Sequence, residues 1–237
     1  MQRIVDWSLP FIFVISVTGV LLASPDPLAR DTLCELTNIC LRLRNQTFWN
    51  PLIYEFGLGA SVSIAFYWLL VKLPQTSKRK RLRSYLRGSY RAFRREVTLQ
   101  FLFAAEQKPI ALDTLDTLIS QADFRAYFKQ PSIDVDGDKW HDVQNHITAR
   151  NLQDIGVATT IFRDDMAYVL NNSDVVDQRS FEMLQRLTKA SSHWNFLSAD
   201  YDDQKSLFGF YWHVMAGWDP VYGYPKEDPI LRMIGQI

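Results

Sequence analysis

Two long apolar stretches lie near the start of the chain, and the first covers residues 7–23 without a charged residue. We expect a helix here, with Ser8 as its N-cap and Pro10 in its first turn. At about 1.5 Å per residue, a helix of this length reaches about 25 Å, slightly less than a hydrocarbon core of about 30 Å. A cleaved signal peptide is the alternative, but Arg3 is the one basic residue before the stretch and Pro25 follows it closely. The pattern favours an uncleaved membrane helix.

The second apolar stretch, residues 52–73, predicts a longer membrane helix. Asn50 and Pro51 precede it as a cap and first turn, and Pro74 is expected to end it. Its charged residues are Glu55 and the terminal Lys72. Aromatic residues lie toward both ends, as interfacial positions require. They are Trp49, Tyr54, Tyr67 and Trp68.

Small residues recur at a spacing of four in both stretches, which would let helix backbones approach closely. They are Gly19 and Ala23 in the first stretch, and Gly57 with Ser61 and Gly59 with Ser63 in the second. Two interpretations stay open: packing of the two helices within one hairpin, or association between hairpins of different chains. Glu55 lies about one turn from the outer end of its helix. It is either an acid that reaches the interface or a polar contact in an oligomer.

Basic residues are concentrated directly after the second stretch, and they set the expected topology. Residues 78–95 hold nine of them and no acid. These are Lys78, Arg79, Lys80, Arg81, Arg83, Arg87, Arg91, Arg94 and Arg95. The loop 24–49 holds three, offset by three acids, so the positive-inside rule predicts a multi-pass protein of the bacterial inner membrane with both termini in the cytoplasm. Both cysteines, Cys34 and Cys40, then fall in a periplasmic loop, as a disulfide or as two free thiols.

The basic stretch is also amphipathic, because apolar residues recur between the arginines at roughly helical spacing. They are Leu82, Tyr85, Leu86, Phe93 and Val97. Such a helix would rest its apolar stripe on the bilayer while its arginines meet anionic headgroups, each basic residue contributing on the order of 1 kcal/mol. We therefore expect a juxtamembrane helix that binds membrane lipids. Binding of a partner protein or of a nucleic acid is the alternative.

Beyond residue 106 the pattern is that of a soluble helical domain. Apolar spacing predicts helices over 111–128, over 140–170, after a cap at Ser173 or Asp174, and after a cap at Asp202. The tail from Trp218 holds three prolines and is expected to be irregular. The aromatic residues between Trp194 and Tyr224 are expected in the core, or, where they are exposed, as a protein-binding surface. The sequence thus predicts an all-α protein: a transmembrane hairpin over 1–74, a basic amphipathic juxtamembrane helix over 75–106 and a cytoplasmic helical domain over 107–237.

A search for catalytic or metal-binding motifs in that domain predicts none. Residues 134–138 resemble the start of a calcium loop, but the glycine is fourth instead of sixth and the twelfth position is Asn145. His141 and His146 are five residues apart, the wrong interval for a shared metal face, and His193 and His213 are isolated. The paired acids at 164–165 and 202–203 are interpreted as solvated faces. We therefore expect a protein that is not an enzyme and that uses no cofactor or metal.

The net charge of zero hides a division along the chain. The 26 basic and 26 acidic residues exclude a uniformly basic nucleic-acid binder. Residues 107–237 alone, however, hold 12 basic and 19 acidic residues. A basic belt is thus followed by an acidic domain.

The order of these features along the chain has a further implication. Trp49-Asn50-Pro51 precedes a run from Glu55 to Gly59, and a proline-then-basic boundary at 73–83 leads into the helical domain. This layout resembles that of the small two-span membrane proteins that serve as effectors in bacterial antiphage defence, including retron systems. The resemblance implies a toxin that a partner complex holds inactive and that damages the inner membrane in abortive infection when it is released.

The same resemblance implies a set of partners. These are membrane lipids, a regulatory protein or a reverse transcriptase–nucleic acid complex, and further copies of the chain, as a homo-oligomer in the active state. The alternative is a membrane-tethered adaptor or scaffold, whose helical domain binds a cytoplasmic protein or ribonucleoprotein.

Overall fold

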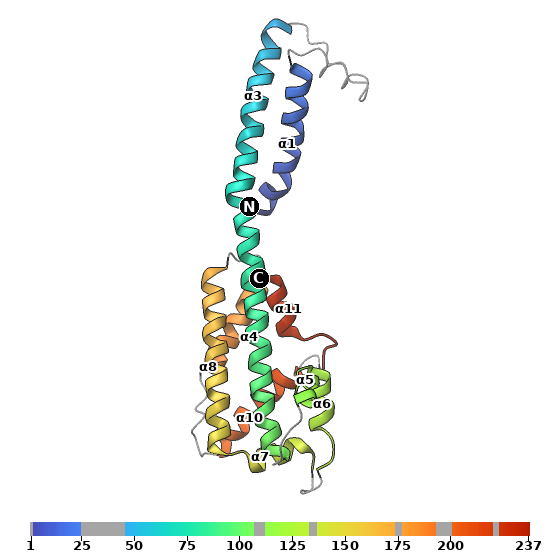
Figure 1. The fold of residues 1–237 in the computed structure, drawn as a ribbon, viewed down its shortest axis with the longest axis vertical. Coiled ribbons are helices and arrows are strands. Elements are labelled where there is room, and N and C mark those ends of the chain that lie inside the picture. The colour runs from blue at the N-terminus through green and yellow to red at the C-terminus, as the bar shows by residue number, and fades with distance from the viewer. Residues whose placement is uncertain are drawn as a thin grey trace. The chain divides into compact units, whose positions relative to one another are not determined.

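The computed structural model describes residues 2–24, 46–106, 112–132, 137–173, 177–192, 201–219 and 223–237. Across these residues the regular structure is helical, with two isolated β-bridges and no strand (Figure 1). The predicted all-α fold is therefore confirmed for this part of the chain. Two compact units make up the chain, Met1–Lys78 and Arg79–Ile237, so the boundary falls a few residues after the predicted one at 74.

The first unit is a pair of packed helices, α1 (Gln2–Ala23) and α3 (Gln46–Tyr67), followed by a short π-helix, η1 (Trp68–Lys72). The two long helices run antiparallel. Gly19 near the end of α1 lies against Ile53 near the start of α3, and Leu9 lines a hollow that it shares with Ile64.

Both helices begin several residues before their predicted caps. Ser8 and Pro10 lie inside α1, and Asn50 and Pro51 lie inside α3. A proline removes one backbone donor and crowds the preceding turn, but an apolar helix can continue through it when its neighbours compensate. Prolines alone therefore did not predict where these helices start.

One helical stretch among the described residues, Phe48–Glu106, is long and apolar enough to cross a membrane, and its apolar window is not buried against the rest of the chain. The described apolar part of α1, Ser8–Leu21, is shorter. By length and composition, the structure thus supports a candidate span in the second predicted stretch. Cys34 and Cys40 lie outside the described residues, so the disulfide stays a prediction.

The helix does not end at Pro74 as predicted but continues into α4 (Leu73–Glu106). The backbone N–H of Leu73 donates to the carbonyl of Trp68, five residues back, which is the bonding of a π-helix. Proline has no N–H to offer to the carbonyl four residues before it. The wider turn of η1 lies next to this missing bond, so the chain passes Pro74 without a break.

The second unit consists of α4 from Arg79 onward and the helices around it. These are α5 (Leu112–Thr117), α6 (Gln121–Phe128), α7 (Lys139–His146), α8 (Ala149–Asn172), α9 (Gln178–Ser191), α10 (Tyr201–Ala216) and α11 (Pro229–Gln236). α4 supplies the centre of the core. Its Phe93 stacks on Phe162 of α8 with ring centroids 4.9 Å apart, and its Phe101 meets Tyr211 of α10 at 5.6 Å. In Figure 1, α4 and α8 run alongside each other.

The apolar stripe of the basic stretch lies inside this core, which corrects the predicted amphipathic lipid anchor. Leu82, Leu86, Phe93 and Val97 are between 0% and 8% exposed. Tyr85 is the exception at 49%. Helical spacing of apolar residues predicts a stripe that must be covered, but it does not say whether lipid or protein covers it. Here α8 and the other helices of the unit do so, and residues 79–106 are not a separate juxtamembrane element.

Two predicted helices are each divided in two by a hydroxyl cap. The 111–128 prediction separates into α5 and α6 at Ser120, whose side chain accepts the backbone N–H of Asp123 at 3.5 Å. The 140–170 prediction separates into α7 and α8 at Thr148, which forms a capping box with Asn151. A Ser or Thr at such a position satisfies free N–H groups of a new helix, so a continuous apolar pattern does not require a continuous helix.

Three further helix ends differ from the predictions. Asp177, and not Ser173, caps α9, while α10 begins at Tyr201, so Asp202 lies within that helix. The tail forms α11, because Asp228 accepts the backbone N–H of Ile230 at 2.9 Å and Pro229 occupies the first helical position.

Candidate functional site

The small residues of the first unit form two groups, one between α1 and α3 and one on the side of α3 that faces away from α1. Gly57 faces α1, since a Cβ at this position would lie 2.8 Å from Val20 Cγ2 and 3.0 Å from the backbone oxygen of Ser16. No ordinary side chain fits at such distances, so a glycine allows this close approach. The same side of the pair holds Gly19, Ala23 and Ser61, of which Ala23 and the Ser61 hydroxyl are buried. These small residues serve packing within the pair.

Gly59 and Ser63 lie on the side of α3 that α1 does not cover. A Cβ at Gly59 would meet no atom within 4 Å beyond its own helix backbone, and Ser63 is exposed. Glu55 is exposed as well, and the four-residue spacing places all three on one face. We call Glu55, Gly59 and Ser63 the α3 seam. It is a narrow strip of polar and small groups beside exposed Phe56 and Phe66.

The nine basic residues of the stretch 78–95 do not form one surface. Arg94 is 2% exposed, Arg83 donates to the carbonyl oxygen of Ile237 at 3.1 Å, and Arg95 pairs with Asp116 at 3.5 Å. Arg79 is half-buried, and the exposed ones are Lys78, Lys80, Arg81, Arg87, Arg91 and Arg95. The predicted role in binding lipid or a partner stays a prediction, and Arg94 differs from the exposed residues in being buried.

Arg94 instead joins segments that are far apart in sequence. Its Nε, Nη1 and Nη2 donate to the carbonyl oxygens of Ile119 at 2.6 Å, Val214 at 3.2 Å and Met215 at 2.8 Å. Nη1 also donates to the hydroxyl of Tyr90 at 3.2 Å. Burial raises the pKa of Tyr90 well above its usual range, so this hydroxyl keeps its proton.

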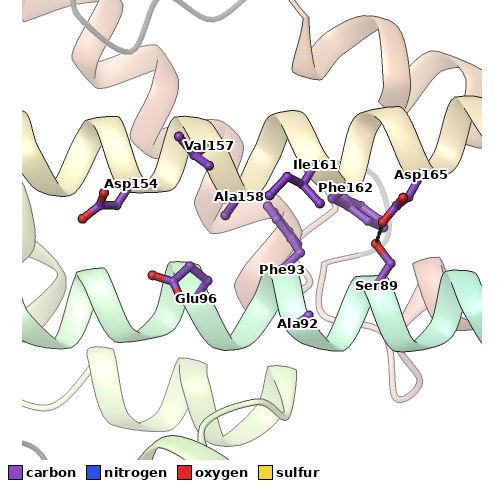
Figure 2. A pocket seen from close by; sticks show the side chains of 10 residues that line it. All are labelled: Ser89, Ala92, Phe93, Glu96, Asp154, Val157, Ala158, Ile161, Phe162 and Asp165. Carbon is purple, nitrogen blue, oxygen red and sulfur yellow. Dashed lines mark hydrogen bonds between the residues drawn. The ribbon is translucent and has the colours of Figure 1, made fainter.

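A groove of about 390 Å³ runs between α4 and α8, within the second unit (Figure 2). We call it the α4–α8 groove. Its lining residues are Ser89, Ala92, Phe93, Glu96, Asp154, Val157, Ala158, Ile161, Phe162 and Asp165. Val157 and Ile161 are 55% and 58% exposed although they are large and apolar, and carboxylates of Glu96 and Asp154 lie beside them (Figure 2).

Asp165 closes the other end of the groove by linking the two helices. It accepts hydrogen bonds from the Tyr85 hydroxyl and from Ser89 Oγ, the latter at 2.5 Å. The hydrogen bond to Asp165 raises the pKa of Tyr85, because the carboxylate favours the protonated phenol. The Tyr85 ring also meets Tyr168 edge to face at 6.1 Å.

The sequence analysis missed this site, having treated 164–165 as a solvated face. The available signal was the spacing of Val157, Ile161 and Tyr168 on α8, which adds a second apolar stripe to the one that enters the core.

Where the structure describes them, the histidines and acids singled out in the sequence do not converge. Among the described residues, no group of three or more His, Cys, Asp or Glu side chains could hold a metal ion. His141 and His146 belong to α7, Asp138 caps that helix by accepting the His141 N–H at 3.0 Å, and His213 Nδ1 lies 2.9 Å from the Trp218 carbonyl oxygen. His193 and residues 133–136 fall outside the described residues.

The aromatic residues near the C-terminus are divided between core and surface. Phe208 and Tyr211 are 3% and 1% exposed, whereas Trp218 and Tyr224 are each 37% exposed. Burial raises the pKa of Tyr211 well above its usual range, and its hydroxyl lies 2.6 Å from Thr159 Oγ1. The core interpretation of this segment therefore holds for Phe208 and Tyr211.

Comparisons of this chain with protein-family models, with curated proteins and with solved structures give no match. The candidate sites are accordingly defined by geometry: the α3 seam in the first unit and the α4–α8 groove in the second.

Proposed function

We propose that this chain is a membrane-perturbing effector, a toxin of a bacterial antiphage system, whose copies associate in the inner membrane through the α3 seam. The observation that supports this proposal is the exposure of Glu55, Gly59 and Ser63 on the face of α3 that α1 leaves uncovered. An anchor needs only large apolar side chains facing lipid. A strip of small and polar groups suits contact with another helix.

The energetics of a bilayer favour covering the α3 seam. An ionisable side chain in a membrane helix costs on the order of 2–3 kcal/mol at the bilayer centre and less near the interface. Interhelical hydrogen bonds contribute about 0.6–2 kcal/mol each, and a glycine lets the backbones come close enough to form them. Several copies joined in this way would line a polar path with Glu55 and Ser63.

In this proposal α1 and α3 cross the inner membrane as a hairpin, and the second unit is a cytoplasmic regulatory domain. Exposed Lys78, Lys80 and Arg81 after the hairpin favour that orientation. The α4–α8 groove supports a role in regulation, because exposed Val157 and Ile161 lie beside acidic groups. Such a surface suits a basic amphipathic helix of the partner complex that holds the effector inactive.

Cysteine cross-linking in membranes tests association through the α3 seam. In a chain with Cys34→Ser and Cys40→Ser, we expect Ser63→Cys to form oxidised dimers in bacterial membranes. Ile64→Cys is the matched control, since its side chain lines the hollow shared with α1. Dimers from both positions, or from neither, would contradict the proposed interface.

Growth and membrane potential test the activity itself. We expect expression of the chain without its genomic neighbours to depolarise and kill cells, because unrestrained copies would assemble. Gly59→Leu should abolish killing, since the added side chain keeps the helices apart. Phe56→Leu, at a 73% exposed position outside the α3 seam, should leave killing intact. Harmless expression of the unaltered chain would sink the effector proposal, and full killing by the Gly59 variant would sink its mechanism.

A membrane-tethered adaptor is the second candidate, and the α4–α8 groove is the observation that favours it. An adaptor uses its membrane segment only for tethering, so replacement of residues 1–74 by an unrelated two-span hairpin should preserve function. The effector proposal expects the same replacement to abolish killing. An Ile161→Glu change in the α4–α8 groove should abolish function in an adaptor but release the toxin in an effector.

A further inference from the structure

A second hollow in the Arg79–Ile237 unit, of about 490 Å³, has several basic side chains in a mixed polar and apolar lining. It lies between α4, the start of α6 and the segment that leads into α11. Among its described lining residues, the cationic side chains are Arg91, Arg94, Arg125 and Lys226, and the acidic side chain is Asp228. We call it the basic pocket. It shares no lining residue with the α4–α8 groove.

Asp228, the acidic side chain of the basic pocket, already forms hydrogen bonds within the fold. Asp228 accepts the Tyr90 hydroxyl at 2.9 Å and the backbone N–H groups of Ile230 and Leu231 at 2.9 Å and 3.2 Å. Arg94 Nη1 lies 4.0 Å from it. Asp228 therefore neutralises the buried Arg94 and caps a helix, and it leaves the other cations of the pocket uncompensated.

Three cations remain at the mouth of the pocket. Within the described part of the chain, none of Arg91, Arg125 and Lys226 forms an ion pair. Arg91 and Lys226 are exposed and Arg125 is half-buried. Like charges that line one pocket repel one another, so an anion bound among them would lower the free energy.

One of these cations is held in place before any ligand arrives. Arg125 Nη1 donates to the carbonyl oxygen of Ala216 at 3.3 Å, and its guanidinium lies 4.2 Å from the centre of the Tyr224 ring. Residues 120–122, the cap and first turn of α6, also line the pocket. The first N–H groups of a helix have no partner within it and carry partial positive charge.

We propose that the basic pocket binds a phosphate-bearing ligand of about nucleotide size. A phosphate group carries up to two negative charges and several acceptor oxygens, so one group can meet several cations and helix N–H groups at once. A carboxylate offers a single charge and two oxygens. The volume of the pocket falls in the range of small-molecule sites, roughly 300–1,000 Å³. A soluble nucleotide and a phospholipid headgroup present the same chemistry.

Calorimetric titration of the full-length chain in a neutral detergent, with pyrophosphate and with ATP, tests this inference. We expect saturable binding that weakens at high salt. Arg91→Gln and Lys226→Gln should each weaken it about tenfold, because each removes one charge-assisted hydrogen bond from an exposed position. Arg186→Gln on α9 is the matched control, since this exposed arginine is not among the residues that line the pocket.

Nanodiscs separate the two sources of phosphate. If a headgroup is the natural ligand, discs containing phosphatidylglycerol compete with pyrophosphate, and discs of phosphatidylcholine alone do not. If the natural ligand is soluble, pyrophosphate binds equally in both. The inference is overturned if neither probe binds saturably, or if the Arg91, Lys226 and Arg186 variants bind equally well. The basic pocket is independent of the α3 seam. The titration can therefore contradict this inference while the cross-linking supports the proposed function, or the reverse.

Discussion

The buried guanidinium of Arg94 offers the sharpest test of how the second unit is held together. The side chain comes from the basic stretch, yet it is 2% exposed and donates to carbonyl oxygens of Ile119, Val214 and Met215. Two of these carbonyls belong to the last turn of α10, where the helix itself provides no donor. We predict that Arg94→Met strongly destabilises the unit, because methionine keeps much of the volume but supplies no hydrogen.

The size of the effect follows from counting the acceptors left behind. Val214 keeps a second donor, since Gln121 Nε2 lies 3.0 Å from its oxygen. Ile119 and Met215 lose the side-chain donors that the structure gives them. A buried acceptor left without a partner costs about 1–3 kcal/mol, so two of them predict a loss of about 2–6 kcal/mol. Removing a whole buried ion pair can be neutral, but here only the donor is removed and the acceptors remain.

Urea unfolding of the full-length chain in a mild detergent, followed by tryptophan fluorescence, measures this loss. Trp140 and Trp212 report on the core of the second unit, where their ring centroids lie 5.0 Å apart. The adjacent Arg95→Met is the control. Arg95 and Asp116 are 49% and 62% exposed, and such surface pairs contribute about 0–1 kcal/mol. Equal unfolding free energies for the Arg94 and Arg95 variants would refute the reasoning.

Further predictions concern the same core. Burial raises the pKa of both Tyr90 and Tyr211. The unfolded chain therefore releases these protons near pH 10, while the folded chain keeps them. The free energy of unfolding should be at its full value below about pH 10 and fall above it. Tyr211→Phe should make the free energy of unfolding depend less on pH above about pH 10. An unchanged pH dependence in urea titrations of this variant would contradict the prediction. Leu86→Ala should lower the free energy of unfolding by about 2–5 kcal/mol, since Leu86 is fully buried. Met183→Ala, at a 46% exposed position, is the control and should change it by no more than about 0.5 kcal/mol. A negligible effect of Leu86→Ala would favour the lipid-facing interpretation. Thr148→Ala should cost about 1 kcal/mol by removing the cap of α8, and equal thermal midpoints for the variant and the unaltered chain would rule the cap out.

The local signals in the sequence predicted the class of structure well. Helical spacing of apolar residues gave an all-α fold, and uninterrupted apolar composition located the candidate span within α3 and η1. These features depend on residues a few positions apart, which the sequence displays directly. The ends of helices were predicted less well, because Pro10, Pro51 and Pro74 lie within helices and Ser120 and Thr148 divide apolar patterns that continue across them.

Only the tertiary structure decided which side of each helix is covered by protein and which side stays exposed. The sequence marked the stripe of Leu82, Leu86 and Phe93 as apolar. That protein and not lipid covers it follows from the core of the second unit, where Phe93 stacks on Phe162 of α8. The same holds for the small residues of α3, where proximity to α1 separates Gly57 from Gly59. It holds also for Arg94, which the sequence grouped with surface arginines. Apolar or basic character belongs to a residue, whereas burial depends on the partners that the fold brings to it, and those partners are distant in sequence.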